Sequence, residues 1–207
     1  MDTSLDVVTT ENELLAVYGS PLPRVNLKEI DHITAHYGKF IEAAPFCAIA
    51  TVSDSGLDCS PRGDPSGFVR VHDPKTLMLP DRSGNNRLDT LRNIISDPRV
   101  AILFLIPGCG EMLRVIGRAK ISSNRDLCAS FILHGKTPKS VLIITAQSVY
   151  FHCAKAILRS NLWSQSSHID RESLPSVGTI LADLSGGRLV AAEHDRAAAE
   201  RLNTGLY

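Results

Sequence analysis

The sequence has no excess of either charge, because 22 lysines and arginines balance 22 aspartates and glutamates over 207 residues. A protein that binds nucleic acid by electrostatics usually carries a basic excess, so that class is disfavoured. Long apolar runs are also missing, and none approaches the roughly 18 residues that a membrane-spanning helix needs. We therefore expect neither nucleic acid nor a membrane as a partner.

Cysteine is sparse and has no scaffold spacing. The five cysteines are odd in number and form no Cys-x-x-Cys pair, which disfavours a disulfide framework and a structural zinc site. His32 and His36 have the i, i+4 spacing of metal ligands but lack a recognisable third ligand, so no metal is predicted. The acidic N-terminus has no basic segment followed by an apolar one, as a secretory signal would. We expect a cytoplasmic protein.

Three familiar motifs are absent as well: G-x-S-x-G, G-x-x-x-x-G-K-[ST] and G-x-G-x-x-G. Each would have indicated a nucleophile or a nucleotide phosphate site. The sequence therefore predicts no particular catalytic residue.

What the chain does contain is a series of short β-like runs, at 46–53, 57–62, 68–72, 76–80, 99–106, 111–122 and 140–151. Helical spacing of apolar residues occurs at 11–18, 27–43, 86–96, 124–133, 152–163, 176–184 and 189–202. A parallel α/β fold needs a helix after most strands, and 46–80 has none. The pattern predicts a mainly-β antiparallel barrel with flanking helices (α+β), and Gly117 predicts a bulge in one strand.

This order also predicts three regions. N-terminal helices over residues 1–44 pack on the barrel, the barrel domain covers 45–165, and a C-terminal helical extension covers 166–207. The extension is amphipathic, so we expect it to pack on the barrel or on a partner subunit.

The most informative turn is D-R-S-G-N-N-R at 81–87, between an apolar strand and a helix expected to begin near Asn86. Asn85 or Asn86 suits the N-cap, and Arg82 and Arg87 can each hold a phosphate through two donors. The free N–H groups and the dipole of a helix N-terminus favour an anion there. An ordinary capped helix with solvated arginines is the alternative for the isolated turn.

A second basic turn, S-P-R-G-D-P at 60–65, lies about twenty residues upstream between two other strand-like runs. The planar guanidinium of Arg62 suits stacking on a ring or holding a second phosphate oxygen. Gly63 here and Gly84 in the first turn leave the backbone open to a ligand. On this segment alone, a β-turn with an exposed arginine is equally favoured.

A third segment, C-A-K-A-I-L-R-S at 153–160, places Lys155 and Arg159 one helical turn apart. Trp163 follows four residues after Arg159. Lys155, Arg159 and Trp163 could form a cationic patch beside an aromatic ring. The more usual outcome is a solvated helix face with the tryptophan packed at the helix end.

Four segments follow one another along the chain: F-C-A-I-A-T-V-S, S-P-R-G-D-P, P-D-R-S-G-N-N-R and F-H-C-A-K-A-I-L-R-S-N-L-W. In this order they resemble the pyridoxamine 5′-phosphate oxidase-like family of flavin-binding split barrels, and the resemblance covers residues 28–165. The resemblance implies a six-stranded antiparallel split barrel and a homodimer with FMN at the interface. It leaves open whether Lys155, Arg159 and Trp163 bind the cofactor of their own subunit or that of the other subunit. With Arg82 from the turn added, the predicted cofactor-binding residues are Arg62, Gly63, Pro80, Asp81, Arg82, Asn85, Asn86, Arg87, Lys155, Arg159 and Trp163.

The C-terminus departs from the family pattern. Pyridoxamine phosphate oxidases carry an Arg- and His-rich segment there that binds the substrate phosphate, whereas this chain places Arg196 and Arg201 on a polar helix. The predicted function is therefore an FMN-binding oxidoreductase with an unknown small-molecule substrate. A non-catalytic flavin-binding or sensing protein and a deazaflavin- or haem-using relative are the alternatives, because fold similarity does not determine the substrate.

Overall fold

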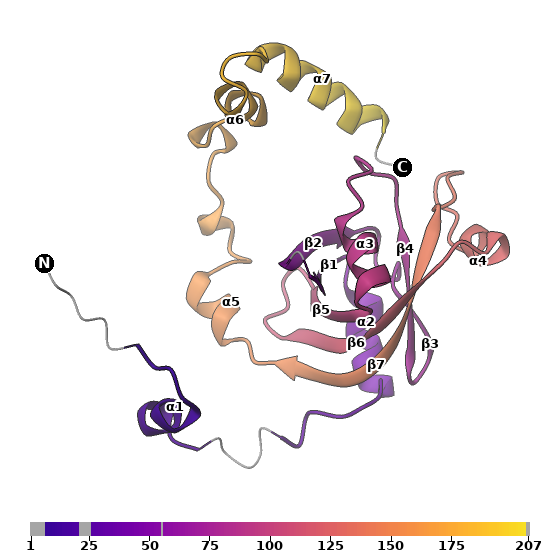
Figure 1. Cartoon of the computed structure of the whole chain (residues 1–207), viewed down its shortest axis with the longest axis vertical. Helices are drawn as coiled ribbons and strands as arrows, with labels where there is room; N and C mark the ends of the chain where they lie inside the picture. The colour runs from indigo at the N-terminus through magenta and orange to yellow at the C-terminus, as the bar shows by residue number, and fades with distance from the viewer. Residues whose placement is uncertain (1–6, 21–25, 55, 206–207) are drawn as a thin grey trace, which may run out of the picture.

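The computed structural model describes residues 7–20, 26–54 and 56–205. Its centre is one antiparallel sheet in the order β2-β1-β5-β6-β7-β4-β3 (Figure 1). The strands are β1 (Phe46–Ser53), β2 (Gly56–Gly63), β3 (Arg70–Asp73), β4 (Thr76–Asp81), β5 (Arg99–Leu105), β6 (Met112–Ser122) and β7 (Ser140–His152). The helices are α1 (Glu11–Tyr18), α2 (Ala35–Ala43), α3 (Asp89–Ser96), α4 (Arg125–Ser130), α5 (Lys155–Ser160), α6 (Val177–Leu184) and α7 (Ala191–Thr204).

The predicted class, a mainly-β antiparallel sheet with flanking helices, is confirmed. The sheet has seven strands where the resemblance implied six. Among the described residues no ladder joins its end strands β2 and β3, so the sheet is open. The difference has a physical cause: a short β3 of only four residues pairs with β4 alone and adds a strand at that edge.

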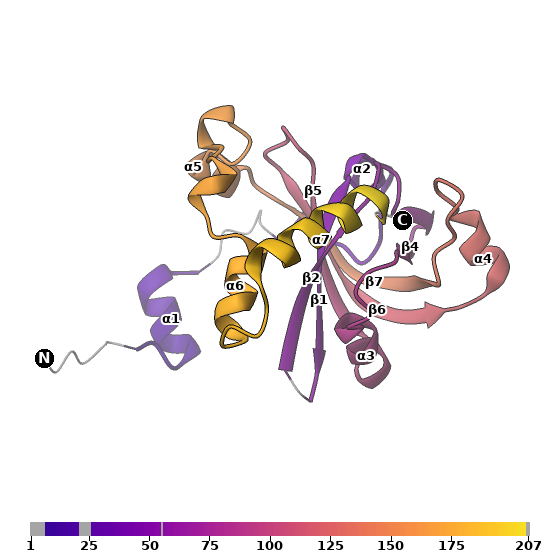
Figure 2. The ribbon, with the colours of Figure 1, turned by 90° about the horizontal axis from the view of Figure 1, so that it is seen from above.

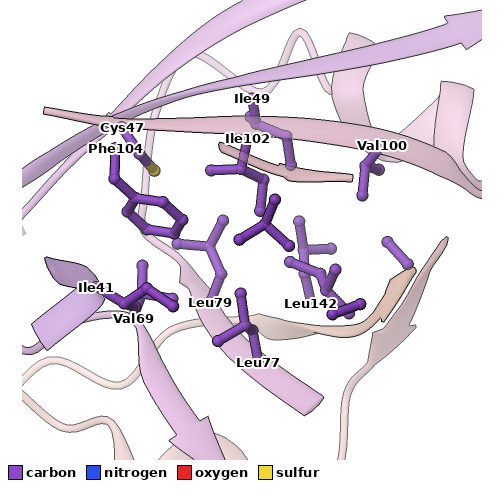
Figure 3. Packing of buried hydrophobic residues seen from close by; sticks show 14 of the residues in the cluster. Ile41, Cys47, Ile49, Val69, Leu77, Leu79, Val100, Ile102, Phe104 and Leu142 are labelled. Atoms are coloured by element: carbon purple, nitrogen blue, oxygen red, sulfur yellow. The ribbon is translucent and has the colours of Figure 1, made fainter. Parts of the chain in front are cut away.

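The hydrophobic core lies between the two halves of the curved sheet. Figure 3 shows side chains of β1 and β5 facing those of β4 and β7 across it. Alternate residues of β5 are buried, Val100, Ile102 and Phe104 among them, because successive side chains of a strand point to opposite faces. The other face of the same strand is half-exposed.

The predicted bulge at Gly117 is confirmed, since the register between β6 and β7 shifts between Ile116 and Gly117. A Cβ added to Gly117 would lie 2.2 Å from the Thr145 carbonyl oxygen. Glycine therefore allows the two strands to approach at the bulge.

The helix predicted over 27–43 is wrong in its first half. Ile30 instead pairs with Val149 of β7, its N–H lying 3.1 Å from the Val149 oxygen. The helix begins only at Ala35, where the Thr34 hydroxyl accepts a hydrogen bond from the Tyr37 N–H. The apolar spacing of residues 27–33 is compatible with a helix. The contact that keeps this segment extended comes from β7, far along the chain, so the spacing alone could not reveal it.

The prediction over 152–163 is also too long, because His152 still belongs to β7 and α5 covers only Lys155–Ser160. Similarly, α4 is shorter than 124–133, since the chain turns at Phe131, whose side chain is buried. The predicted C-terminal helices are confirmed as α6 and α7. They pack on each other where the Asp195 carboxylate accepts from the Gly178 N–H at 2.7 Å.

The helical pair α6 and α7 lies apart from the sheet, whereas α3 covers one end of it (Figures 1 and 2). Within the part of the chain that the structure describes, no helix combines the length and the apolar character needed to cross a bilayer.

Candidate functional site

The two basic turns line one cavity of about 650 Å³. The strands that carry them, β2 and β4, are not neighbours in the sheet, so the curvature of the sheet brings the turns together. The predicted residues that line the cavity are Arg62, Gly63, Pro80, Asp81, Arg82, Asn85, Asn86 and Arg87. Its volume lies within the range of about 300–1,000 Å³ that is typical of small-molecule sites.

Two arginine–aspartate pairs connect the turns reciprocally. The Arg82 Nε atom lies 2.6 Å from Asp64 Oδ2, and the Arg82 Nη1 atom donates to the Phe131 carbonyl at 2.8 Å. The side chain of Asp64 is only 1% exposed, so this pair is largely dry. The guanidinium of Arg82 therefore holds the two turns together, and its predicted contact with a cofactor stays a prediction.

The second pair is looser. Arg62 Nη2 lies 3.7 Å from Asp81 Oδ1, beyond hydrogen-bond distance, and both side chains border the cavity. Burial raises the pKa of Asp81, against the opposing charges of Arg62 and Lys139. The Arg62 guanidinium is thus held near the cavity without being saturated by its partner.

The helix after the first turn begins later than predicted. It starts at Asp89, and its N-cap residue is Leu88, which makes no side-chain cap. The prediction of Asn85 or Asn86 as N-cap is wrong, because Asn86 and Leu88 both have left-handed backbone, with φ of 58° and 62°. Asn85 instead closes a local turn, in which its Oδ1 accepts from the Arg87 N–H at 3.0 Å.

This late start changes the role of Arg87. Its side chain is 79% exposed and pairs with Asp89, the acidic residue of the first helical turn. The carboxylate of Asp89 raises the pKa of Arg87 through a hydrogen bond and through its charge. Arg87 borders the cavity, and its predicted contact with a phosphate stays a prediction.

Sequence reasoning missed three kinds of lining residue. Lys139 directly precedes β7 and Ser140 opens it, Phe68 adds an aromatic ring, and Thr90 lies in the first turn of α3. The Thr90 hydroxyl donates to Asp58 of β2 at 2.9 Å, which ties α3 to the wall of the cavity. Lys139 lies more than fifty residues from either motif, so no local pattern pointed to it.

The third predicted segment lies elsewhere. Ser140 at the cavity opens β7, and Lys155 follows the far end of this 13-residue strand, a span of about 40 Å at the usual rise per residue. Arg159 Nε bonds to the Lys155 carbonyl at 3.3 Å, and Trp163 Nε1 donates to the Cys109 carbonyl at 2.6 Å. One chain therefore does not bring Lys155, Arg159 and Trp163 to its own cavity.

The cavity combines cationic groups with an apolar wall. Arg62, Arg87 and Lys139 offer donors to an anion, while Phe68 and Pro80 offer apolar surface. A Cβ added to Gly84 would have no atom within 4 Å, so the turn backbone is open to a ligand. The arrangement suits a ligand with a flat apolar body and an anionic end.

Comparison with solved structures finds HupZ from Group A Streptococcus, 21% identical, which covers 56% of this chain and 91% of its own at a TM-score of 0.44. A candidate pyridoxamine 5′-phosphate oxidase from Lactobacillus delbrueckii is 18% identical and covers 58% and 95% at 0.47. An FMN-binding protein from Syntrophomonas wolfei is 12% identical and covers 55% and 86% at 0.41. No match was found among curated proteins.

The family assignment rests on a different comparison. The family model described as pyridoxamine 5′-phosphate oxidase matches residues 33–153, which is more than half of the chain. This match covers β1 to β7 and both basic turns, and it confirms the resemblance seen in the sequence. The chain therefore belongs to the pyridoxamine 5′-phosphate oxidase family.

Proposed function

We propose that the protein binds FMN in the cavity between the two basic turns and acts as a flavin-dependent oxidoreductase on a small molecule. The observation that carries the proposal is the convergence of both turns and Lys139 on one cavity with an apolar wall. When bound, the flavin supplies the redox chemistry, and the protein supplies binding, orientation and electrostatics. Family membership supports a flavin in general, and the choice of FMN rests on the cationic side chains.

The residues of the cavity divide into two tasks. Arg62 and Lys139 provide charge for the phosphate end, because neither is bound to a dry carboxylate. Pro80 and Phe68 provide apolar contact for the ring. The dry Arg82–Asp64 pair keeps the walls at a constant separation.

We further propose that the functional unit is a homodimer with the cofactor at the subunit interface. The separation of Lys155, Arg159 and Trp163 from the cavity supports this, since a second copy could supply them. The half-exposed apolar face of β5, which includes Leu103 and Leu105, offers a surface for such a contact. Among the described residues of one chain, Lys155, Arg159 and Trp163 do not line the cavity.

The direct test is to denature the purified protein and identify the ligand that is released. We expect FMN, and the native protein should be yellow. A colourless protein that takes up no added FMN would contradict the proposal. Release of a deazaflavin or of haem would instead support the alternative in which the protein uses that cofactor. Bound FMN without oxidation of any reduced nicotinamide or amine substrate would favour the non-catalytic protein.

The location of the site is tested separately with Arg62→Met and Lys139→Met. Each should weaken FMN binding by about 1.5–3 kcal/mol, the usual value of a hydrogen bond to a charged group. Lys120→Met is the matched control, because Lys120 is exposed on β6 and lies outside the cavity. Equal affinities of all three variants, measured by flavin fluorescence, would place the phosphate elsewhere.

A further inference from the structure

A second polar cluster lies on the outer face of β6 and β7, at the end of β7 far from the cavity. Tyr150 and His152 alternate on β7 and point to the same side, opposite the buried Val149. Arg114 stands directly across from Tyr150 in the β6–β7 register. Lys28, from the segment before α2, lies over the Tyr150 ring. All four side chains are half-exposed.

The polar atoms of this cluster are mostly donors. Arg114 Nη1 donates to the Tyr150 hydroxyl at 2.7 Å, which leaves the Tyr150 O–H free to donate in turn. Lys28 Nζ donates to the Phe151 carbonyl at 2.8 Å and retains two further protons. His152 Nε2 is sheltered from solvent, yet among the described residues it has no hydrogen-bond partner. A sheltered polar atom of this kind is uncommon and indicates a missing partner.

The cations of the cluster also lack counter-charges. Two carboxylates close to these residues along the chain have other partners, since Glu29 accepts from the Ser148 hydroxyl at 2.6 Å and Glu111 from the Cys109 thiol at 3.6 Å. Among the described residues, neither Lys28 nor Arg114 has a carboxylate oxygen within 4 Å. Burial lowers the pKa of His152, and the charges of Arg114 and Lys28 lower it further.

We infer that this cluster, Lys28, Arg114, Tyr150 and His152, binds an oxyanion, the carboxylate or phosphate of a small-molecule ligand. An oxyanion between Arg114 and Lys28 would balance both charges and accept from the Tyr150 hydroxyl. It would also supply the acceptor that a protonated His152 Nε2 lacks. The inference does not rest on flavin binding, because no residue of the cluster lines the cavity.

The test follows His152 by NMR in the full-length protein labelled at histidine, with His152→Asn used to assign its signals. The pKa of His152 is measured in sodium chloride and then with sodium phosphate or sodium acetate at the same ionic strength. We expect a saturable rise of about one unit, because a bound anion stabilises the imidazolium. A response to phosphate alone or to acetate alone identifies the preferred oxyanion.

Three variants separate this site from general salt effects. Arg114→Met should abolish the rise, and Lys28→Met serves if Arg114→Met fails to fold. Arg118→Met, an exposed arginine on the same strand, should retain it. No rise with either anion, or a rise that Arg114→Met and Lys28→Met leave intact, would overturn the inference. Flavin absorption of the same samples reports the cavity independently.

Discussion

At the residue scale, the two arginines of the first turn have different surroundings, although their spacing suggested the same role for both. Both were expected to hold an anion, but Arg82 pairs with the dry Asp64 whereas Arg87 is exposed beside Asp89. The reason is that a guanidinium has donors for several partners, and the nearest carboxylate in space is decided by the fold. Lys139, which no motif included, is the added cation at the cavity.

The Arg82–Asp64 pair should contribute to stability. Arg82→Met should lower the free energy of unfolding by about 3–5 kcal/mol, because it removes the close cation from a buried carboxylate. Urea denaturation measures the change, and Asp64→Asn in the same background should recover part of it. As a control, Arg99→Met breaks an exposed pair with Asp97 and should cost less than about 1 kcal/mol. Equal losses in both variants would be inconsistent with a buried pair.

Asp81 should make stability depend on pH in the opposite sense to most carboxylates. Burial raises its pKa in the folded state, so the folded protein binds a proton more readily than the unfolded chain. Its ionisation therefore destabilises the fold as the pH rises above the ordinary value of 3.8. Asp81→Asn should be more stable than the natural protein at pH 7, and the difference should shrink toward pH 4.

The measurement is a pair of denaturation curves at each pH. Asp97→Asn is the contrasting control, because the pKa of Asp97 is lowered to about 2 by its hydrogen bonds to Arg99. A gain in stability from Asp97→Asn at pH 7, or a loss from Asp81→Asn, would reverse the expected signs.

At the element scale, strands were easier to predict than helix starts. A strand such as β5 is recognisable from its continuous apolar run. The start of α3 is instead set by the left-handed backbone of Asn86 and Leu88, after which the helix begins. The shift of three residues from Asn86 to Asp89 matters for the site. The later start moves the free N–H groups of the helix three residues along the chain and places the acidic side chain of Asp89 beside them.

The bulge in β6 provides an element-scale prediction. Gly117→Ala should destabilise the protein by about 1–3 kcal/mol, since the added methyl would meet the backbone of Thr145 at 2.2 Å. Gly84→Ala is the matched control, with nothing within 4 Å and no left-handed backbone, and should leave stability nearly unchanged. Thermal unfolding compares them. Gly84→Ala should instead weaken FMN binding, which Gly117→Ala would affect only through unfolding.

At the scale of the whole molecule, the C-terminal helices expose much apolar surface. Val177, Ile180 and Leu184 of α6 are each at least 44% exposed, and α6 packs on α7 and lies apart from the sheet. Their i, i+3, i+7 spacing puts them on one face of α6, and grouped exposed apolar side chains are typical of surfaces that meet another molecule. A partner subunit would cover them, in agreement with the proposed homodimer.

The proposed dimer predicts that flavin binding and association are linked. Dilution should dissociate the dimer and release FMN together, because FMN binds the dimer in preference to the monomer and therefore stabilises the dimer. Sedimentation at several protein concentrations, with and without added FMN, measures both. Ile180→Glu should weaken association if α6 meets the partner, whereas Thr179→Glu, which adds the same charge at an exposed polar residue of that helix, is the control. A monomer that binds FMN with a concentration-independent affinity would contradict the linkage.

The sequence by itself determined the antiparallel β class, the bulge at Gly117, the two C-terminal helices and the two basic turns, because these depend on local periodicity and on side-chain chemistry. The tertiary structure decided which turns meet, which arginine is locked by Asp64, and that Lys139 joins them. It also separated Lys155, Arg159 and Trp163 from the cavity by the length of β7. Such outcomes depend on contacts between residues far apart in the chain, which the curvature of the sheet creates and no local pattern records.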